Sequence, residues 1–215
     1  MRIEKLIEPK LRGGRFTLLL GTGETLRLQP SVVSEFGLYE GMELEDGAVA
    51  RMKIADGKAS AKARAVRIAS ASGVSQKELR RRLVQKGETQ ENAGEAVEWL
   101  SSLNLLDDGE TARQLASDAA RKGYGAARIR QILFQKGIPR ELWDEAMEEL
   151  PSPEGAIDRF LQARFRGDSP DEKEIKRAVD ALLRRGHRWG DIKDALRRYT
   201  DNLDDITEDE TWQTP

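Results

Sequence analysis

The apolar residues of this 215-residue chain follow two spacings, one before residue 57 and another after it. Before that point, short apolar runs at residues 15–20 and 25–28 flank the polar stretch Gly21-Thr22-Gly23-Glu24. Two short apolar runs around a glycine-containing turn are typical of a β-hairpin. A further apolar run at residues 3–7 is placed to add a third strand.

A short helix is expected to follow the hairpin, because Pro30-Ser31 favours a helix start and Gly37 favours its end. The stretch at residues 21–25 faintly resembles a phosphate-binding loop, but it lacks the lysine and the following helix, so we interpret it as a turn. Residues 1–56 are therefore predicted to form a small β-rich extension with one short helix.

After residue 57 the apolar residues follow helical spacing and repeat at intervals of 49 to 50 residues, in register with Gly87, Gly137 and Gly186. After each glycine comes a quartet of apolar residues at positions i, i+3, i+4 and i+7, which is the stripe of an amphipathic helix. The quartets are Ala93, Ala96, Val97, Leu100; Trp143, Ala146, Met147, Leu150; and Ile192, Ala195, Leu196, Tyr199. Alanine at the second place of every quartet favours close helix packing there.

Each repeat is predicted to hold three helices, which in the first repeat span about residues 58–71, 75–86 and 89–102. The period is longer than that of tetratricopeptide or ankyrin repeats. We therefore predict a mostly α fold with three tandem three-helix repeats in an elongated array, after the β-rich extension. The expected segments after the extension are 57–106, 107–152 and 153–200 for the repeats, and 201–215 for an acidic, disordered tail.

Capping signals support these helix boundaries. Ser75-Gln76-Lys77-Glu78 and Ser169-Pro170-Asp171-Glu172 both have the pattern of an N-terminal capping box, and Asp107-Asp108 precedes the helix that holds residues 111–120. The glycine that ends each middle helix suits a left-handed stop, so we interpret the repeat glycines as structural.

Charge is distributed unevenly along the chain. The net charge is −2, but the last fifteen residues carry six acids and no base, whereas residues 53–200 carry 29 basic and 24 acidic residues. The tail is interpreted either as a solubilising terminus or as a segment that competes with nucleic acid for the basic body.

The residues of catalytic chemistry are sparse. There is no cysteine and one histidine, His187, which lies in a basic turn and is expected at the surface or against an anion. The adjacent carboxylates Asp107-Asp108 and Glu148-Glu149 would point about 100° apart on a helix. We therefore expect no enzyme, no metal and no cofactor. No apolar run approaches a membrane span and the N-terminus lacks a signal-peptide pattern, so a cytoplasmic protein is expected.

Basic residues on the outer faces of the predicted middle helices are the better candidates for function. Arginine predominates, and its planar fork suits phosphates and carboxylates. The candidate contacts are Arg81, Arg82, Lys86, Arg128, Arg130, Lys136, Arg184, Arg185 and Arg188. The competing interpretation is a solvated helix face whose charge is balanced by Glu78, Glu95 and Glu98. For Arg130 a further alternative is a salt bridge at the buried edge of the core, because this residue borders its apolar stripe.

Aromatic residues do not interleave with these arginines, so a stacking platform for single-stranded nucleic acid is not predicted. Trp143 lies on a core stripe, Trp99 just off one, and Trp189 in a turn where it is a candidate contact. Trp212 in the acidic tail is a candidate docking anchor.

One stretch of the second repeat runs Gly125-Ala126-Ala127-Arg128-Ile129-Arg130-Gln131-Ile132-Leu133-Phe134-Gln135-Lys136-Gly137-Ile138. Two other stretches accompany it, Leu105–Ala112 upstream of it and Ser75–Leu83 in the first repeat. Together the three stretches resemble the RecX family of recombinase regulators, whose central signature the first one matches. The resemblance covers about residues 57–200, and the chain departs from the family pattern at Thr111, at Ala93 and in an insertion near Gly167.

The resemblance implies a modulator of the RecA recombinase that is mostly inhibitory. Such proteins lie in the helical groove of the RecA–single-stranded-DNA filament and block its extension, ATP hydrolysis, strand exchange and coprotease access in the SOS response. The expected partner is thus the RecA filament, with weak binding to single- or double-stranded DNA, no membrane and a monomeric chain. Alternatives are a DNA-binding protein that uses the repeats as helix-turn-helix-like readers, or a helical scaffold for an unrelated partner.

Overall fold

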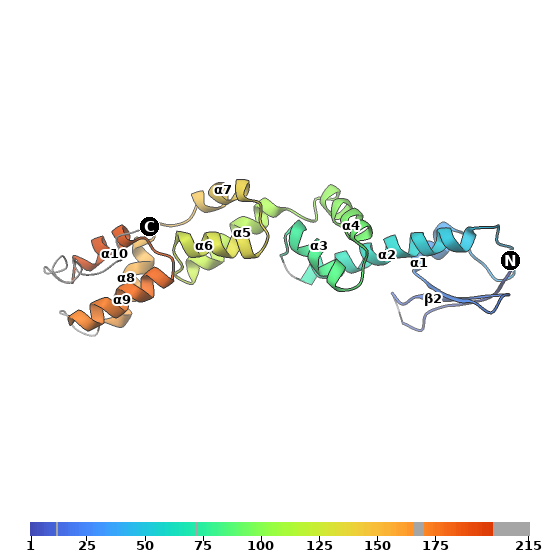
Figure 1. Cartoon of the computed structure of the whole chain (residues 1–215), viewed down its shortest axis with the longest axis horizontal. Helices are drawn as coiled ribbons and strands as arrows, with labels where there is room; N and C mark the ends of the chain where they lie inside the picture. The colour runs from blue at the N-terminus through green and yellow to red at the C-terminus, as the bar shows by residue number, and fades with distance from the viewer. Residues whose placement is uncertain (12, 72, 166–169, 200–215) are drawn as a thin grey trace. The chain divides into compact units, whose positions relative to one another are not determined.

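A computed structural model describes residues 1–11, 13–71, 73–165 and 170–199. The chain divides into two compact units, residues 1–106 and residues 107–215. Figure 1 shows a small sheet near the N-terminus and helices over the rest of the chain. The predicted fold class is confirmed: the protein is mostly α-helical, with a small N-terminal three-stranded sheet.

The sheet in the first unit is antiparallel and follows chain order, β1 (Ile3–Ile7), β2 (Phe16–Leu20) and β3 (Thr25–Leu28). The predicted hairpin and third strand are therefore confirmed, and the glycine-containing stretch between β2 and β3 is a turn. Alternate residues of β2 and β3 face inward, so Leu18 and Leu26 join one buried apolar cluster.

Two helices follow the sheet. α1 (Pro30–Glu35) begins at the predicted proline and ends before Gly37, whose φ is +57°. α2 (Ala48–Ala71) is a single helix of 24 residues that begins ten residues earlier than the predicted start at residue 58. The predicted start of this helix was wrong, because residues 48–57 are helical and pack on the sheet instead of forming a connection between the sheet and the first repeat.

Burial along α2 shows this double role. Near its start Met52 is buried with the sheet, whereas Ala61 and Ala65 are buried in the core of the first repeat. At Gly57 a Cβ would lie 2.8 Å from Nδ2 of Asn92, so the missing side chain lets another helix of the repeat approach α2 closely. The boundary predicted between residues 56 and 57 thus falls inside a continuous helix.

A polar cluster also ties α2 to the sheet. Asp56 accepts hydrogen bonds from the backbone N–H of Gln29 at 2.6 Å and from Nη1 of Arg15 at 2.8 Å. Arg15 also donates from Nη2 to Ser60 one turn later on α2. Because the Asp56 side chain is only 13% exposed, these bonds compensate the burial of its charge.

Each repeat consists of three helices, with a short 3₁₀ turn added in the second. The helices after α2 are α3 (Gln76–Gln85) and α4 (Gln90–Ser102) in the first repeat; α5 (Asp108–Arg121), α6 (Ala126–Gln135), η1 (Arg140–Leu142) and α7 (Trp143–Glu148) in the second; and α8 (Glu154–Arg164), α9 (Glu172–Arg184) and α10 (Trp189–Leu196) in the third. Among the described residues, each repeat has its own cluster of buried apolar side chains.

The predicted apolar quartets form the repeat cores. Their second-place alanines, Ala96, Ala146 and Ala195, are all buried. In the second quartet the larger side chains of Trp143 and Met147 are only partly buried against the cluster. The stripe therefore identifies the inward face of each third helix correctly.

Most of the capping predictions are confirmed. The Ser75 hydroxyl accepts a hydrogen bond from the Glu78 N–H, and Asp107 caps α5 in the same way. In the third repeat the predicted cap at Ser169 is replaced, because the capping box at the start of α9 is formed by Asp171 and Glu174. The insertion near Gly167, Ser169 itself and the tail at 201–215 lie outside the described residues.

Candidate partner-binding surface

The predicted contacts of the first repeat lie along α3 and at its C-terminal end. Arg81 and Lys86 are exposed, whereas Arg82 is half-buried beside the core stripe. Arg81 forms a two-bond fork with the Glu78 carboxylate, donating from Nε and Nη2 at 2.7 Å each, and Arg82 donates from Nε to the same group at 2.7 Å. One carboxylate therefore holds two of the candidate arginines.

Glu78 is strongly stabilised in its charged form by this arrangement. The hydrogen bond from Arg81, followed by that from Arg82 and by their positive charges, lowers the pKa of Glu78 to about 2, although partial burial opposes the shift. The carboxylate is thus ionised at neutral pH and neutralises part of the positive charge of α3. The competing interpretation of a balanced helix face is correct for this pair.

The cations of the second repeat lie on and beside a helix that also carries an exposed aromatic side chain. Arg128 and Arg130 lie on α6 and Lys136 lies at its C-terminal cap. Arg130 is 3.6 Å from Asp144 on α7. Because the Asp144 side chain is 93% exposed, this ion pair lies at the surface and not at the buried edge of the core that the position of Arg130 suggested. Phe134, on the same helix, is 62% exposed.

Phe134 corrects the prediction that no aromatic residue interleaves with the arginines. Its repeat position matches Val84 and Leu183, which are only partly exposed, so register alone predicted a packed side chain.

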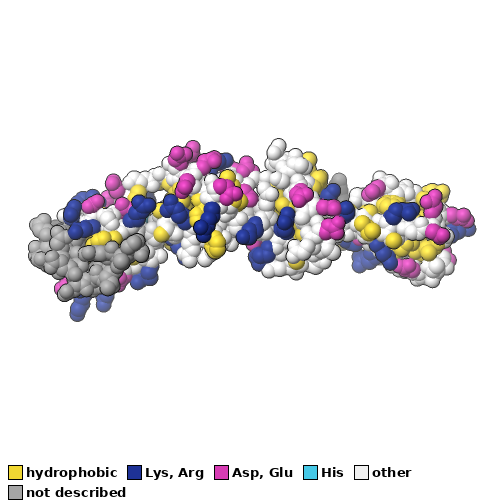
Figure 2. All heavy atoms as spheres, turned by 45° about the horizontal axis from the view of Figure 1, so that its top comes forward, with side chains coloured by type: hydrophobic (Ala, Val, Ile, Leu, Met, Phe, Trp, Pro, Cys, Tyr) yellow, Lys and Arg dark blue, Asp and Glu magenta, His cyan; other side chains and the backbone are white. Residues whose placement is uncertain are grey.

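Figure 2 shows that Lys and Arg side chains alternate with hydrophobic and acidic ones on the face in view. The face in view is thus mixed in character instead of uniformly basic.

The second and third repeats meet through their backbones in the second unit. The N–H of Gly125 donates to the carbonyl of Arg185 at 2.8 Å, and the N–H of Ala127 donates to that of Gly186 at 3.1 Å. A Cβ on Gly125 would lie 2.3 Å from the Gly186 oxygen, and one on Gly186 would lie 2.3 Å from the backbone nitrogen of Arg128. These two glycines permit a contact that no larger residue fits.

This junction brings together candidate residues that are almost 60 positions apart in sequence. Arg128 lies in the first turn of α6, while Arg185 and Arg188 flank the loop that contacts this turn. The Arg185 guanidinium lies 4.8 Å from the ring centroid of Phe160, and that of Arg128 lies 5.9 Å from the ring centroid of Tyr124. Stacking on an aromatic ring holds a guanidinium in place without cancelling its charge.

Arg184 and Arg188 are the most exposed candidates at this end of the chain. Neither forms an ion pair within the described ranges. Both therefore keep their charge available to an external anion, in contrast to Arg81 and Arg82.

His187 is not at the surface, so its predicted placement was wrong. The residue is 5% exposed, and its Nε2 lies 3.1 Å from the carbonyl oxygen of Gly123. Burial, as the largest effect, lowers the pKa of the imidazole below its usual range. Since a carbonyl only accepts, Nε2 carries the proton of the neutral ring and Nδ1 is a buried acceptor without a hydrogen-bond partner among the described atoms.

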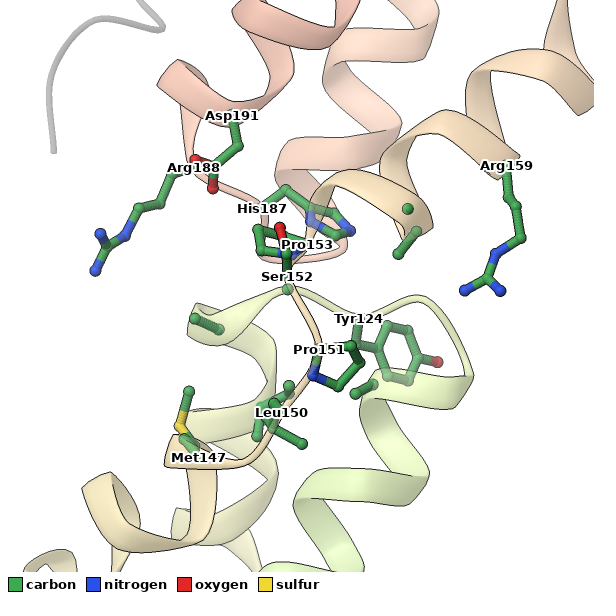
Figure 3. A pocket seen from close by; sticks show the side chains of 16 residues that line it. Tyr124, Met147, Leu150, Pro151, Ser152, Pro153, Arg159, His187, Arg188 and Asp191 are labelled. Carbon is green, nitrogen blue, oxygen red and sulfur yellow. The ribbon is translucent and has the colours of Figure 1, made fainter.

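A groove of about 600 Å³ lies beside the same junction and was not predicted. Figure 3 shows Tyr124, Met147, Leu150 and Pro151 on one side of it, with His187 opposite. Arg159 and Arg188 extend from different elements at its two sides. The helix break Pro151-Ser152-Pro153 is the one sequence feature that could have indicated this groove. The other lining residues come together only through packing between two repeats.

The ranges of the chain that the structure describes hold neither a candidate metal site nor a candidate membrane span. No group of three His, Cys, Asp or Glu side chains is placed to hold a metal ion within those ranges. Within the same ranges, no helix is both long and apolar enough to cross a membrane.

Trp99 is partly buried against the core of the first repeat, as its position beside the apolar stripe predicted. Trp189 is partly buried against the core of the third repeat, so it packs more than its predicted position in a turn suggested.

Comparison with known proteins adds evidence on the family. A family model described as RecX, second three-helix domain, matches residues 107–147. A solved crystal structure of regulatory protein RecX superposes with a TM-score of 0.68 at 23% identity, covering 90% of this chain and 98% of that one. RecX from Lactobacillus salivarius superposes with a TM-score of 0.61 at 16% identity, covering 67% and 97%. Both structures share the fold.

Curated relatives are closer in sequence. Regulatory protein RecX of Shigella boydii is 35% identical over 151 residues, which are 64% of this chain and 90% of the relative. RecX of Escherichia coli O1:K1 is 34% identical over 153 residues, with the same coverage. Because the match spans nearly all of each relative and agrees with the helical repeats described above, the chain belongs to the RecX family of regulatory proteins.

Proposed function

We propose that this chain modulates the RecA recombinase, mostly as an inhibitor, by binding the groove of the RecA–single-stranded-DNA filament without chemistry of its own. The observation that carries the proposal is membership of the RecX family, which a relative 35% identical over 151 residues shows. A binder of this kind shifts the filament between states by its differential affinity for them. Filament extension, ATP hydrolysis, strand exchange and coprotease access would all decrease together.

The contact surface is proposed to include Arg128, Arg184, Arg185 and Arg188 in the second unit and the cations of α3 in the first. Two observations support this choice: Arg184 and Arg188 form no ion pair with any described residue, and Arg128 and Arg185 stack on aromatic rings. All four present donors that suit phosphates and carboxylates. Arg81 and Arg82 contribute less charge because Glu78 is already bound to them.

The test measures ATP hydrolysis by RecA on single-stranded DNA while the chain is added below the concentration of RecA. We expect hydrolysis to fall, and the double variant Arg184→Glu/Arg188→Glu to require at least about tenfold more protein, since reversing two contacts costs more than about 1.4 kcal/mol. Arg121→Glu is the matched control, because Arg121 is an exposed arginine of the same unit that lies outside the proposed surface. An unmodified chain that leaves hydrolysis, strand exchange and filament length unchanged would refute the proposal.

Binding to DNA alone is the second candidate, and the exposed cations of a small groove favour it. Arg67 and Lys86 line this groove of about 320 Å³ in the first unit, and neither forms an ion pair within the described part of the chain. Phosphate-driven binding would lose affinity steeply with salt, with a slope near −0.9 per phosphate contact on duplex DNA. Weak salt dependence together with retained inhibition of RecA would reject this candidate in favour of the filament.

A further inference from the structure

The groove between the second and third repeats has features of a binding site. Its floor is apolar, from Tyr124, Met147, Leu150 and Pro151, and its volume of about 600 Å³ lies in the range of sites that enclose a ligand. An exposed apolar concavity favours an occupant that covers it.

The rim of the groove is positively charged. Arg159 and Arg188 lie on opposite sides of it, as Figure 3 shows, and neither has an ion-pair partner among the described residues. The one acidic side chain in the lining is Asp191. The rim therefore favours an anionic occupant, and the floor favours one with a large apolar side chain.

The chain itself contains a segment with this chemistry. Residues 201–215 hold six carboxylates and no basic residue, and Trp212 follows Asp209 and Glu210 by two or three positions. Trp212 supplies a large apolar surface. Charge and size thus both agree with the groove.

The tail is also long enough to reach it. α10 contains eight residues, so the groove residues at its first turn lie about 12 Å from its last turn. Trp212 lies thirteen positions after Tyr199, and an extended chain of thirteen steps spans up to about 45 Å. A tethered segment has an effective concentration in the millimolar range, so a weak site suffices.

We propose that the acidic tail docks into this groove through Trp212, with its carboxylates against Arg159 and Arg188. The docking does not depend on the proposed function, but its consequence does. Because Arg188 belongs to the proposed filament contacts, a docked tail covers it and lowers the affinity for the filament. Undocking would raise that affinity about two- to five-fold if the tail is docked between half and four-fifths of the time.

Site-specific labelling is straightforward because the chain has no cysteine. In the Thr214→Cys chain a nitroxide is attached to the new thiol, and paramagnetic broadening is measured at backbone amides of the full-length protein. We expect selective broadening at Tyr124, Ser152 and Gly155, which line the groove. Broadening should vanish with Trp212→Ala and with Arg159→Ala/Arg188→Ala, and should persist with Gln213→Ala and Arg121→Ala.

The outcomes separate the docking from its role and from other occupants. Broadening that is absent, that concentrates on residues 1–106, or that persists in Trp212→Ala overturns the docking. Broadening can also be measured in a mixture of a nitroxide-labelled chain and an isotope-enriched chain without nitroxide. If broadening is seen only in that mixture, the groove binds the tail of a second copy, and docking within one chain is overturned. If docking is found but Trp212→Ala inhibits RecA no more strongly than the unmodified chain, the regulatory role is refuted. If the unmodified chain does not inhibit RecA at all, the proposed function fails while the docking stands on the amide data.

Discussion

Replacing Gly186 by alanine should disrupt the junction between the second and third repeats. Gly186 has a φ of +84°, and an added Cβ would lie 2.3 Å from the backbone nitrogen of Arg128. Two independent penalties therefore apply at one position. A left-handed backbone costs an alanine about 1–2 kcal/mol, and forcing a methyl group into close contact costs about 1–3 kcal/mol. The total loss of stability is about 2–5 kcal/mol.

Two other glycines separate these penalties. Gly87 occupies the same position in the first repeat with a φ of +92°, but nothing lies within 4 Å of a Cβ there, so Gly87→Ala should cost only about 1–2 kcal/mol. Gly125 has a φ of −82°, but a Cβ would lie 2.3 Å from Gly186, so Gly125→Ala should show only the contact penalty of about 1–3 kcal/mol.

Amide hydrogen exchange followed peptide by peptide is the suitable assay, because the two units can open independently. The junction N–H groups of Gly125 and Ala127 should lose at least about tenfold protection in Gly186→Ala, since 1.4 kcal/mol is a factor of ten. Gly87→Ala should change exchange only in residues 1–106. If Gly186→Ala is no more destabilising than Gly87→Ala, the argument from close backbone contact is wrong.

Three further predictions concern charged groups. Asp56→Ala should leave the Gln29 N–H and Arg15 without their shared acceptor and destabilise the sheet by about 2–3 kcal/mol, seen as faster amide exchange in β2 and β3. Because the pKa of Glu78 is lowered to about 2, its contribution to the free energy of unfolding is full above pH about 4.5 and is lost as the pH falls towards 2. In acid unfolding, Glu78→Gln should lack this loss of stability between about pH 4.5 and 2. Burial lowers the pKa of His187, so the folded state favours the neutral ring. The second unit should therefore lose stability as the pH falls below about 6.5, where the unfolded chain takes up a proton. Urea unfolding of His187→Gln should depend less on pH in this range.

The repeat architecture could be predicted because its signals are local. A quartet such as Ala93, Ala96, Val97 and Leu100 fixes the inward face of one helix by spacing alone, and the structure buries all four side chains. The left-handed glycines are equally local, since the end of a helix imposes the backbone conformation.

The features that depend on contacts between elements could not be predicted. His187 lies in a basic turn by sequence, but it is buried because the turn packs against Gly123, 64 residues earlier. The groove lined by Tyr124 and Arg159 exists only where two repeats meet. Register placed Phe134 with packed residues, yet the side chain is 62% exposed, and nothing in its local sequence indicated this.

The shared helix α2 has a consequence for how the chain can change in length. Successive residues of an α-helix are 100° apart, so one residue inserted between Met52 and Ala61 would turn the sheet-facing side of α2 away from the side that enters the repeat. An insertion of seven residues would nearly restore the phase, with an error of about 20°. Length changes should therefore be tolerated in the turns around the sheet but rejected, except in whole heptads, within the middle of α2.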